Sequence, residues 1–479
     1  MTTPAAHRKT LRVGLLGPVH NLHPRRTHDF VSAMVVTQVY ERPFVEGATG
    51  QPLVPLVFSE PLRDESAGGA GTAYSAAVRS GMRFSDGTEL AAAHVAASLA
   101  ATEVVAREAS VEARGERVYF RLRQPNPRFD LTLTQTYCGI ALERGGELLG
   151  SGPYRVAPGS SAESLRLERN PHYRGAVPID EVVFTVYPPA ADGSAERLVQ
   201  AVESGAVDFT NLLSRDDVGK LRHARKWFQP GNSTAILYFN TERPFLAEPA
   251  VRRALVQAVD RRAIAQISYS NALAFTATGL LPPMLDTSRD GLGFNLARAR
   301  AELADAGGDR AAAPLRLLVI WGPRPYLPHP RPVGEAIARQ LGALGVAVDV
   351  SQAADSDDYY RRVGGGDYDM LLAGWITDTV DPADFFEANL SSDLIPALDK
   401  QMATRANRSR YRNAAMDRAL AHFRSERSAD AKGEVLRLLR EEVPLLPLMY
   451  GPTVVAHSWR VKNFEPTPIG LPDFSKLDV

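Results

Sequence analysis

The stretch that decides the fold begins Leu315-Arg-Leu-Leu-Val-Ile-Trp321, an apolar run that is typical of a buried strand. Helical spacing of apolar residues follows over 333–344, and strand-like runs follow over 346–350 and over Tyr368-Asp-Met-Leu-Leu-Ala-Gly-Trp375. We expect a further helix around 359–363. This alternation of strands and helices predicts an α/β fold with a mostly parallel sheet covered by helices on both faces.

The same kind of pattern extends from that stretch toward both ends of the chain. Residues 11–16 form a short apolar strand candidate, residues 30–40 have helical spacing, and residues 235–239 are again strand-like. Two long helices are expected at about 411–423 and 429–442, ahead of a strand at 445–450. The α/β pattern therefore covers most of the chain.

Size and charge limit the classes of function. The chain has 479 residues and a mass of 52.1 kDa, which favours two or three packed units. Its 55 basic residues balance its 55 acidic ones. Because nucleic acids and anionic membranes bind surfaces with an excess of positive charge, we predict neither as a partner.

Residues with catalytic or metal-binding chemistry are sparse. Cys138 is the single cysteine, so an intramolecular disulfide is excluded, and its apolar surroundings in the sequence favour a small buried residue. His20 and His23 lie three apart, but no further ligand follows at convincing spacing, and we predict no metal site and no cofactor. Motifs of hydrolases, metalloproteases, P-loop proteins and dinucleotide-binding proteins are absent, so we expect a protein that is not an enzyme.

The start of the chain does not predict an export signal. Basic side chains precede an apolar stretch that is short and interrupted by Arg12, without a small-residue cleavage site after it. No run reaches the roughly 18 apolar residues of a membrane helix, so we predict no membrane insertion.

Several short motifs occur in order along the chain: Asn21-Leu-His-Pro24, Arg83-Phe-Ser-Asp-Gly-Thr88, Gly150-Ser-Gly-Pro-Tyr154, Leu167-Glu-Arg-Asn-Pro-His-Tyr173, Tyr238-Phe-Asn-Thr241, Gly374-Trp375, Asp378, and Glu442-Val-Pro-Leu-Leu-Pro-Leu448. Together they resemble the oligopeptide, dipeptide and nickel binding proteins known as solute-binding protein family 5. This sequence departs from the family pattern at His23 and His94, where the family usually has an acidic residue.

The resemblance implies a two-lobed fold of the periplasmic-binding-protein type (type II, cluster C), with two strands crossing between the lobes. A small extra domain is inserted in the first lobe of such proteins. Mapped onto this sequence, the first lobe covers residues 9–44, 151–236 and 452–479, the extra domain 45–150, and the second lobe 237–451.

The resemblance also implies a site in the cleft between the lobes, where family members hold peptides in an extended conformation. Asp378 matches the acidic residue that holds the ligand's ammonium group, and Trp375 would form a wall. The alternatives are a surface or helix-capping role for Asp378 and core packing for Trp375. Further candidates, which contact ligand or only hold the hinge, are Tyr450, Tyr238, Asn240 and Asn21.

The expected function is therefore to bind a small solute, a peptide or peptide-like compound, for uptake through an ABC permease, with the protein acting as a monomer. The family is periplasmic or extracellular. Because no export signal is predicted, a cytoplasmic solute sensor or a biosynthetic protein on the same scaffold stays open as an alternative.

Overall fold

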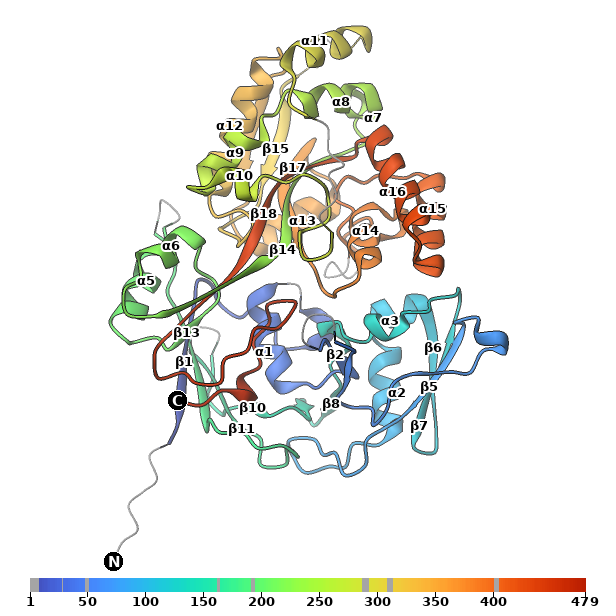
Figure 1. Cartoon of the computed structure of the whole chain (residues 1–479), viewed down its shortest axis with the longest axis vertical. Helices are drawn as coiled ribbons and strands as arrows, with labels where there is room; N and C mark the ends of the chain where they lie inside the picture. The colour runs from blue at the N-terminus through green and yellow to red at the C-terminus, as the bar shows by residue number, and fades with distance from the viewer. Residues whose placement is uncertain are drawn as a thin grey trace, which may run out of the picture.

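The computed structural model describes residues 8–27, 29–47, 51–161, 164–190, 194–286, 293–307, 313–399 and 405–479. Figure 1 shows two halves joined by two long strands that run side by side, β14 (Arg225–Phe239) and β18 (Leu445–His457). Within the described residues one ten-stranded sheet passes through both halves, in the order β10-β11-β12-β1-β13-β18-β14-β17-β15-β16.

The half at the bottom of Figure 1, which we call the first lobe, is built on β1 (Thr10–Leu15). This strand lies parallel to β12 (Glu181–Val186) and β13 (Phe209–Thr210). The antiparallel strands β11 (Ser164–Arg169) and β10 (Tyr154–Val156) extend the sheet. The helices of this lobe include α1 (Phe30–Val39), α5 (Glu196–Glu203) and α6 (Arg215–Lys220).

A separate small unit, which we call the extra domain, lies beside the first lobe. Its antiparallel sheet has the order β4-β5-β7-β6, with bounds Arg63–Asp64, Ala73–Ala77, Arg117–Leu122 and Ala109–Arg114. Helices α2 (Ala92–Ala100) and α3 (Glu103–Glu108) accompany this sheet. Its hydrophobic core draws on residues between 44 and 149 and contains Cys138, which confirms the prediction that this cysteine is buried.

The upper half, which we call the second lobe, contains the α/β pattern that opened the sequence analysis. Strand β15 (Leu315–Val319) lies parallel to both β16 (Val348–Gln352) and β17 (Met370–Ile376), as predicted. The helices are α7 (Pro244–Ala247), α8 (Pro249–Gln257), α9 (Arg261–Ser268), α10 (Ala272–Phe275), α11 (Leu296–Asp305), α12 (Pro330–Gly342), α13 (Ser356–Gly365), α14 (Pro382–Leu390), α15 (Ala414–Glu426) and α16 (Ala429–Glu442).

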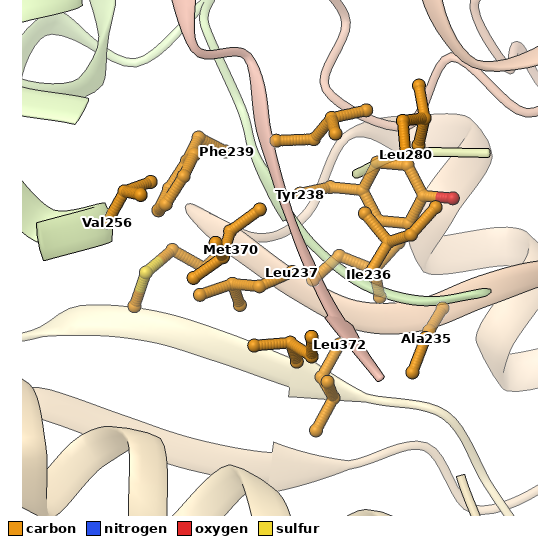
Figure 2. Close-up of a cluster of buried hydrophobic side chains, with 14 of the residues drawn as sticks. Ala235, Ile236, Leu237, Tyr238, Phe239, Val256, Leu280, Met370 and Leu372 are labelled. Carbon is orange, nitrogen blue, oxygen red and sulfur yellow. The ribbon is translucent and has the colours of Figure 1, made fainter. Parts of the chain in front are cut away.

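One apolar core fills the second lobe and holds its sheet rigid. Strand β14 pairs with β17 so that Leu237 lies opposite Leu372 and Phe239 opposite Met370. Figure 2 shows these side chains packed together with Tyr238 in the same cluster. All of them are buried, so the end of the crossing strand is anchored by the hydrophobic effect.

The pairing of the crossing strands changes partway along their length. Strand β14 pairs with β18 over most of its length, with a register shift between Gln229 and Ser233. Only the part of β14 from Ser233 onward also pairs with β17. A bulge of this kind bends a strand and interrupts its ladder of hydrogen bonds. No helix among the described residues combines the length and apolar character needed to cross a bilayer.

Candidate functional site

A cavity of about 1350 Å³ lies between the two lobes. Its walls come from segments that follow the parallel strands of each lobe: β1, β12 and β13 in the first, and β15, β16 and β17 in the second. The carboxyl ends of parallel strands are where α/β sheets bind ligands. Each of these segments contributes lining residues. Examples, given in the order of the strands named above, are Gly17, Pro189, Ser214, Trp321, Asp355 and Asp378.

The second-lobe wall of the cavity is strongly aromatic. The ring of Trp321 lies 5.0 Å from that of Tyr359 and 6.0 Å from that of Tyr360, measured between centroids. Tyr326 and Trp375 line the same wall. Aromatic side chains give a binding surface large apolar area at a low cost in side-chain entropy.

Asp378 is the acidic group of this wall. It follows β17, is half-buried and lines the cavity. Burial raises its pKa to about 8, the nearby carboxylate of Asp384 adds to that rise, and a hydrogen bond with the Tyr137 side chain opposes it. No ion pair joins Asp378 to a basic side chain within the part of the chain that the structure describes.

Trp375 combines the two interpretations that the sequence left open. It stands near the end of β17, packs partly against the second-lobe core and also lines the cavity. The guanidinium of Arg408 lies 5.5 Å from the centroid of its ring. The structure thus brings Asp378 and Trp375, two of the predicted site residues, to the same wall.

The other four predicted residues lie outside the cavity lining. Tyr238 is fully buried and donates a 2.8 Å hydrogen bond to Oδ1 of Asn389. Nδ2 of Asn240 donates to the carbonyl oxygen of Tyr368 at 2.9 Å. This bond ties the end of β14 to the segment just before β17. Their side-chain polar groups are satisfied inside the second lobe, and their role as ligand contacts or hinge residues stays a prediction.

Tyr450 and Asn21 also make local contacts. The Tyr450 hydroxyl accepts a hydrogen bond from the backbone N–H of Gly279 at 2.9 Å, so it fastens a loop to β18. Oδ1 of Asn21 accepts from the backbone N–H of His23 at 2.8 Å and shapes the turn after β1. The neighbouring His20 lines the cavity in its place.

Sequence reasoning missed several lining residues. Tyr137 reaches the cavity from the extra domain, Arg408 from the segment before α15, and the proline-rich segment 322–332 forms one rim. The rule that sites lie at strand carboxyl ends would have pointed to that rim, because it follows β15 directly. Arg408 carried no such signal, since it is far from any strand end in the sequence.

The metal alternative raised for the two N-terminal histidines gains no support from their positions. Nε2 of His23 lies 3.3 Å from Oε1 of Glu143, and its Nδ1 accepts from the backbone N–H of Arg25 at 3.2 Å. Among the described residues, no group of three or more His, Cys, Asp or Glu side chains is arranged to hold a metal ion.

Polar contacts bridge the cleft on both sides of the cavity. On one side, the hydroxyl of Ser270 in the second lobe donates to Asp216 of α6 at 3.0 Å. On the other side, α3 of the extra domain faces the second lobe. Its Glu103 lies 3.0 Å from the guanidinium of Arg405, and its Glu108 lies 3.4 Å from that of Arg424. These contacts join the two sides of the cleft in this structure.

Comparison with known proteins identifies the chain's relatives. The family model of bacterial extracellular solute-binding proteins, family 5, matches residues 69–395. A probable ABC transporter periplasmic-binding protein, SapA of Escherichia coli strain K12, is 26% identical over 383 residues, which cover 75% of this chain and 67% of the relative. Di/tripeptide-binding protein 2 of Pseudomonas aeruginosa is 28% identical over 388 residues, covering 75% and 70%.

A solved structure confirms the predicted two-lobed α/β fold. The dipeptide-binding protein from Pseudoalteromonas sp. SM9913, solved in complex with Met-Leu, superposes with a TM-score of 0.84 at 18% identity and covers 98% of this chain and 100% of its own. The family consists of binding proteins rather than enzymes. With a match over more than half of its length, the chain belongs to family 5 of the bacterial extracellular solute-binding proteins.

Proposed function

We propose that this solute-binding protein takes a peptide or peptide-like solute whose ammonium group pairs with Asp378. The observation that carries the proposal is a carboxyl group that lines the cavity and has no basic partner among the described residues. A partly buried carboxylate without a cation is unfavourable, and a ligand ammonium supplies that cation through a charge-assisted hydrogen bond. The names of the relatives, which include di/tripeptide-binding proteins, support the same solute class.

In this proposal the predicted lobes move toward each other and close on the ligand. Separate hydrophobic cores lie in the first lobe, the extra domain and the second lobe. This supports three moving bodies with the bounds expected from the sequence: the first lobe at 9–44, 151–236 and 452–479, the extra domain at 45–150, and the second lobe at 237–451. The register shift between Gln229 and Ser233 lies where β14 and β18 pass between the lobes, and we place the hinge there. A ligand that touches both lobes stabilises the closed state.

The partners and location of the protein follow from this role. A protein that works as a monomer, as the family resemblance implies, is part of this proposal. As a member of an extracellular solute-binding family, it would meet its ligand outside the cytoplasm and deliver it to the permease of an ABC importer.

Calorimetric titration with matched peptides tests the proposal. Trialanine should bind, and N-acetyl-trialanine should bind at least about 30-fold more weakly, because acetylation removes the ammonium charge. Asp378→Asn should weaken trialanine by a similar factor while leaving the melting temperature at or above that of the wild type. Mass spectrometry of compounds that co-purify with the protein gives an independent identification. If trialanine and mixed di- and tripeptides all fail to bind or to raise the melting temperature, the peptide assignment is wrong.

A further inference from the structure

Three aromatic side chains that line the cavity contact one another in the second-lobe wall. The ring centroids of Tyr359 and Tyr360 lie 5.2 Å apart, and both rings lie within 6.0 Å of the Trp321 ring. The planes of Trp321 and Tyr360 are inclined to each other by 60°, and those of Trp321 and Tyr359 by 57°. The three rings therefore form an angled surface, which we call the aromatic corner, instead of a flat wall.

Two rings of the aromatic corner keep exposed surface, while the third is fully buried. Tyr359 is part of the second-lobe core. Trp321 and Tyr360 are only partly buried: they pack against that core and also line the cavity. A ligand group that covers these two rings removes apolar surface from water, which is favourable.

The fold holds the indole of the corner in place. Trp321 follows β15, and the residue before it is tied to two other strands. The N–H of Ile320 donates to the carbonyl oxygen of Leu372 in β17 at 3.1 Å, and its carbonyl oxygen accepts from Nε2 of Gln352 in β16 at 3.1 Å. The guanidinium of Arg324 lies over the indole, with its Cζ 4.1 Å from the ring centroid. A ring that is fixed before binding loses little freedom when a ligand covers it.

The start of α1 brings the first lobe close to the aromatic corner. Asp29, the N-cap of this helix, is close enough to Tyr360 for the two groups to interact electrostatically. The next two side chains, Phe30 and Val31, are partly buried and line the same cavity. A ligand group in the corner thus lies near both lobes, and contacts with both lobes favour the closed state.

An aromatic ring fits the geometry of this corner better than an aliphatic group does. Aromatic rings attract one another in offset-stacked and edge-to-face arrangements, with centroids about 4.5–7 Å apart. A ring that stacks on Trp321 or on Tyr360 is inclined by 60° to the other of the two, which approaches an edge-to-face contact. A saturated ring of similar size supplies the apolar area without these contacts.

We propose that Trp321 and Tyr360 form a pocket for an aromatic side chain of the ligand. The inference rests on the proposed function, and it narrows the solute to peptides or peptide-like compounds that carry a phenyl, phenol or indole group. Asp378 follows β17, whereas the corner stands after β15 and on α13. The ammonium group and the ring of one solute therefore have separate places on the same wall.

Calorimetry with phenylalanine placed at each position of trialanine tests the pocket. One of Phe-Ala-Ala, Ala-Phe-Ala and Ala-Ala-Phe should bind the wild type about 10- to 100-fold more tightly than trialanine, because a buried phenyl ring removes a large apolar area from water. The same peptide with cyclohexylalanine in place of phenylalanine should bind about 2- to 10-fold more weakly than the phenylalanine peptide, since the saturated ring lacks the aromatic contacts.

Two variants assign the preference to the rings of the corner. Trp321→Leu and Tyr360→Leu keep an apolar side chain and remove the ring. Each should lower the ratio of the phenylalanine-peptide affinity to the trialanine affinity to less than about threefold, and should abolish the preference over cyclohexylalanine. The matched control is Trp459→Leu, which removes a tryptophan that is 64% exposed and lies outside the cavity lining, and it should keep both preferences.

Distinct results overturn the inference. If no phenylalanine peptide binds more tightly than trialanine, the pocket does not exist. If cyclohexylalanine binds as well as phenylalanine, the site is apolar without being selective for aromatic rings. An unchanged affinity ratio in both leucine variants gives Trp321 and Tyr360 a structural role only. Trp321→Phe, which keeps a smaller ring and should lower the ratio in part, covers the case in which the leucine variants do not fold.

A thermal-shift arm separates this inference from the proposed function if no peptide binds. The neutral compound phenylpropanamide should then raise the melting temperature of the wild type and not that of Trp321→Leu, and cyclohexylpropanamide should raise it less. This result would keep the aromatic pocket while the peptide role falls. No rise with phenylpropanamide, or an equal rise with both compounds, contradicts the pocket.

Discussion

At the scale of single residues, the raised pKa of Asp378 makes ligand binding depend on pH. Burial raises the pKa of this carboxyl to about 8, so below pH 8 it carries a proton that must leave before an ammonium group can pair with it. The affinity for trialanine should therefore rise by up to about tenfold for each pH unit between pH 6 and 8. Above about pH 8 the affinity should fall again, because the α-amino group of the peptide loses its own proton.

Titrations in buffers with different ionisation enthalpies check the proton count directly. At pH 6.5 nearly one proton should be released for each peptide bound, and Asp378→Asn should show neither the release nor the slope. A wild-type affinity that stays constant from pH 6 to 8 would mean that Asp378 does not take the ammonium group.

At the scale of elements, the sequence predicted strands well where their residues are apolar and less well where the strands cross. The parallel strands β15 and β17 were found from runs such as Leu315–Val319, because burial of every residue there except Arg316 selects apolar side chains. In contrast, only residues 235–239 of β14 and 445–450 of β18 were predicted. The missed parts of these strands include Pro230 and Pro452, which predict breaks, whereas the paired strands accept a register shift there.

The sequence predicted some of the residues that line the cavity and missed others. Asp378 and Trp375 belong to a motif at a strand end, so a pattern locates them. Arg408 and Tyr137 reach the cavity from a loop and from the extra domain, and only the packing of distant segments brings them there.

The crossing strands depend on a close approach that one glycine permits. A Cβ added at Gly451 of β18 would lie 2.6 Å from the Cα and 2.7 Å from the backbone nitrogen of Tyr326, which cannot move aside as a flexible side chain does. We predict that Gly451→Ala lowers the free energy of unfolding by about 1–3 kcal/mol, visible as a lower melting temperature. The control Gly433→Ala adds a methyl group where nothing lies within 4 Å, in the exposed face of α16, and should leave stability equal or slightly higher.

At the scale of the whole molecule, we expect the ion pairs across the cleft to favour closure of the lobes before ligand arrives. Glu103 and Glu108 of α3 meet Arg405 and Arg424 of the second lobe, and all four side chains are largely shielded from water. Pairs of this kind stabilise the closed state more than exposed pairs do, because the solvent screens them less. A closed state that is more populated without ligand raises the apparent affinity by the same factor.

Replacing both glutamates by glutamine tests this role of the pairs, since the shape is kept and the charge is lost. We predict that the double variant Glu103→Gln with Glu108→Gln opens the ligand-free protein, seen as a larger radius of gyration in X-ray scattering. It should also weaken peptide binding by about 3- to 30-fold, equivalent to about 0.6–2 kcal/mol for the two pairs. Glu112→Gln is the matched control, because Glu112 lies in the same domain and pairs with Arg114 of its own hairpin. An unchanged radius and affinity in the double variant would mean that these two ion pairs do not determine how far the lobes close.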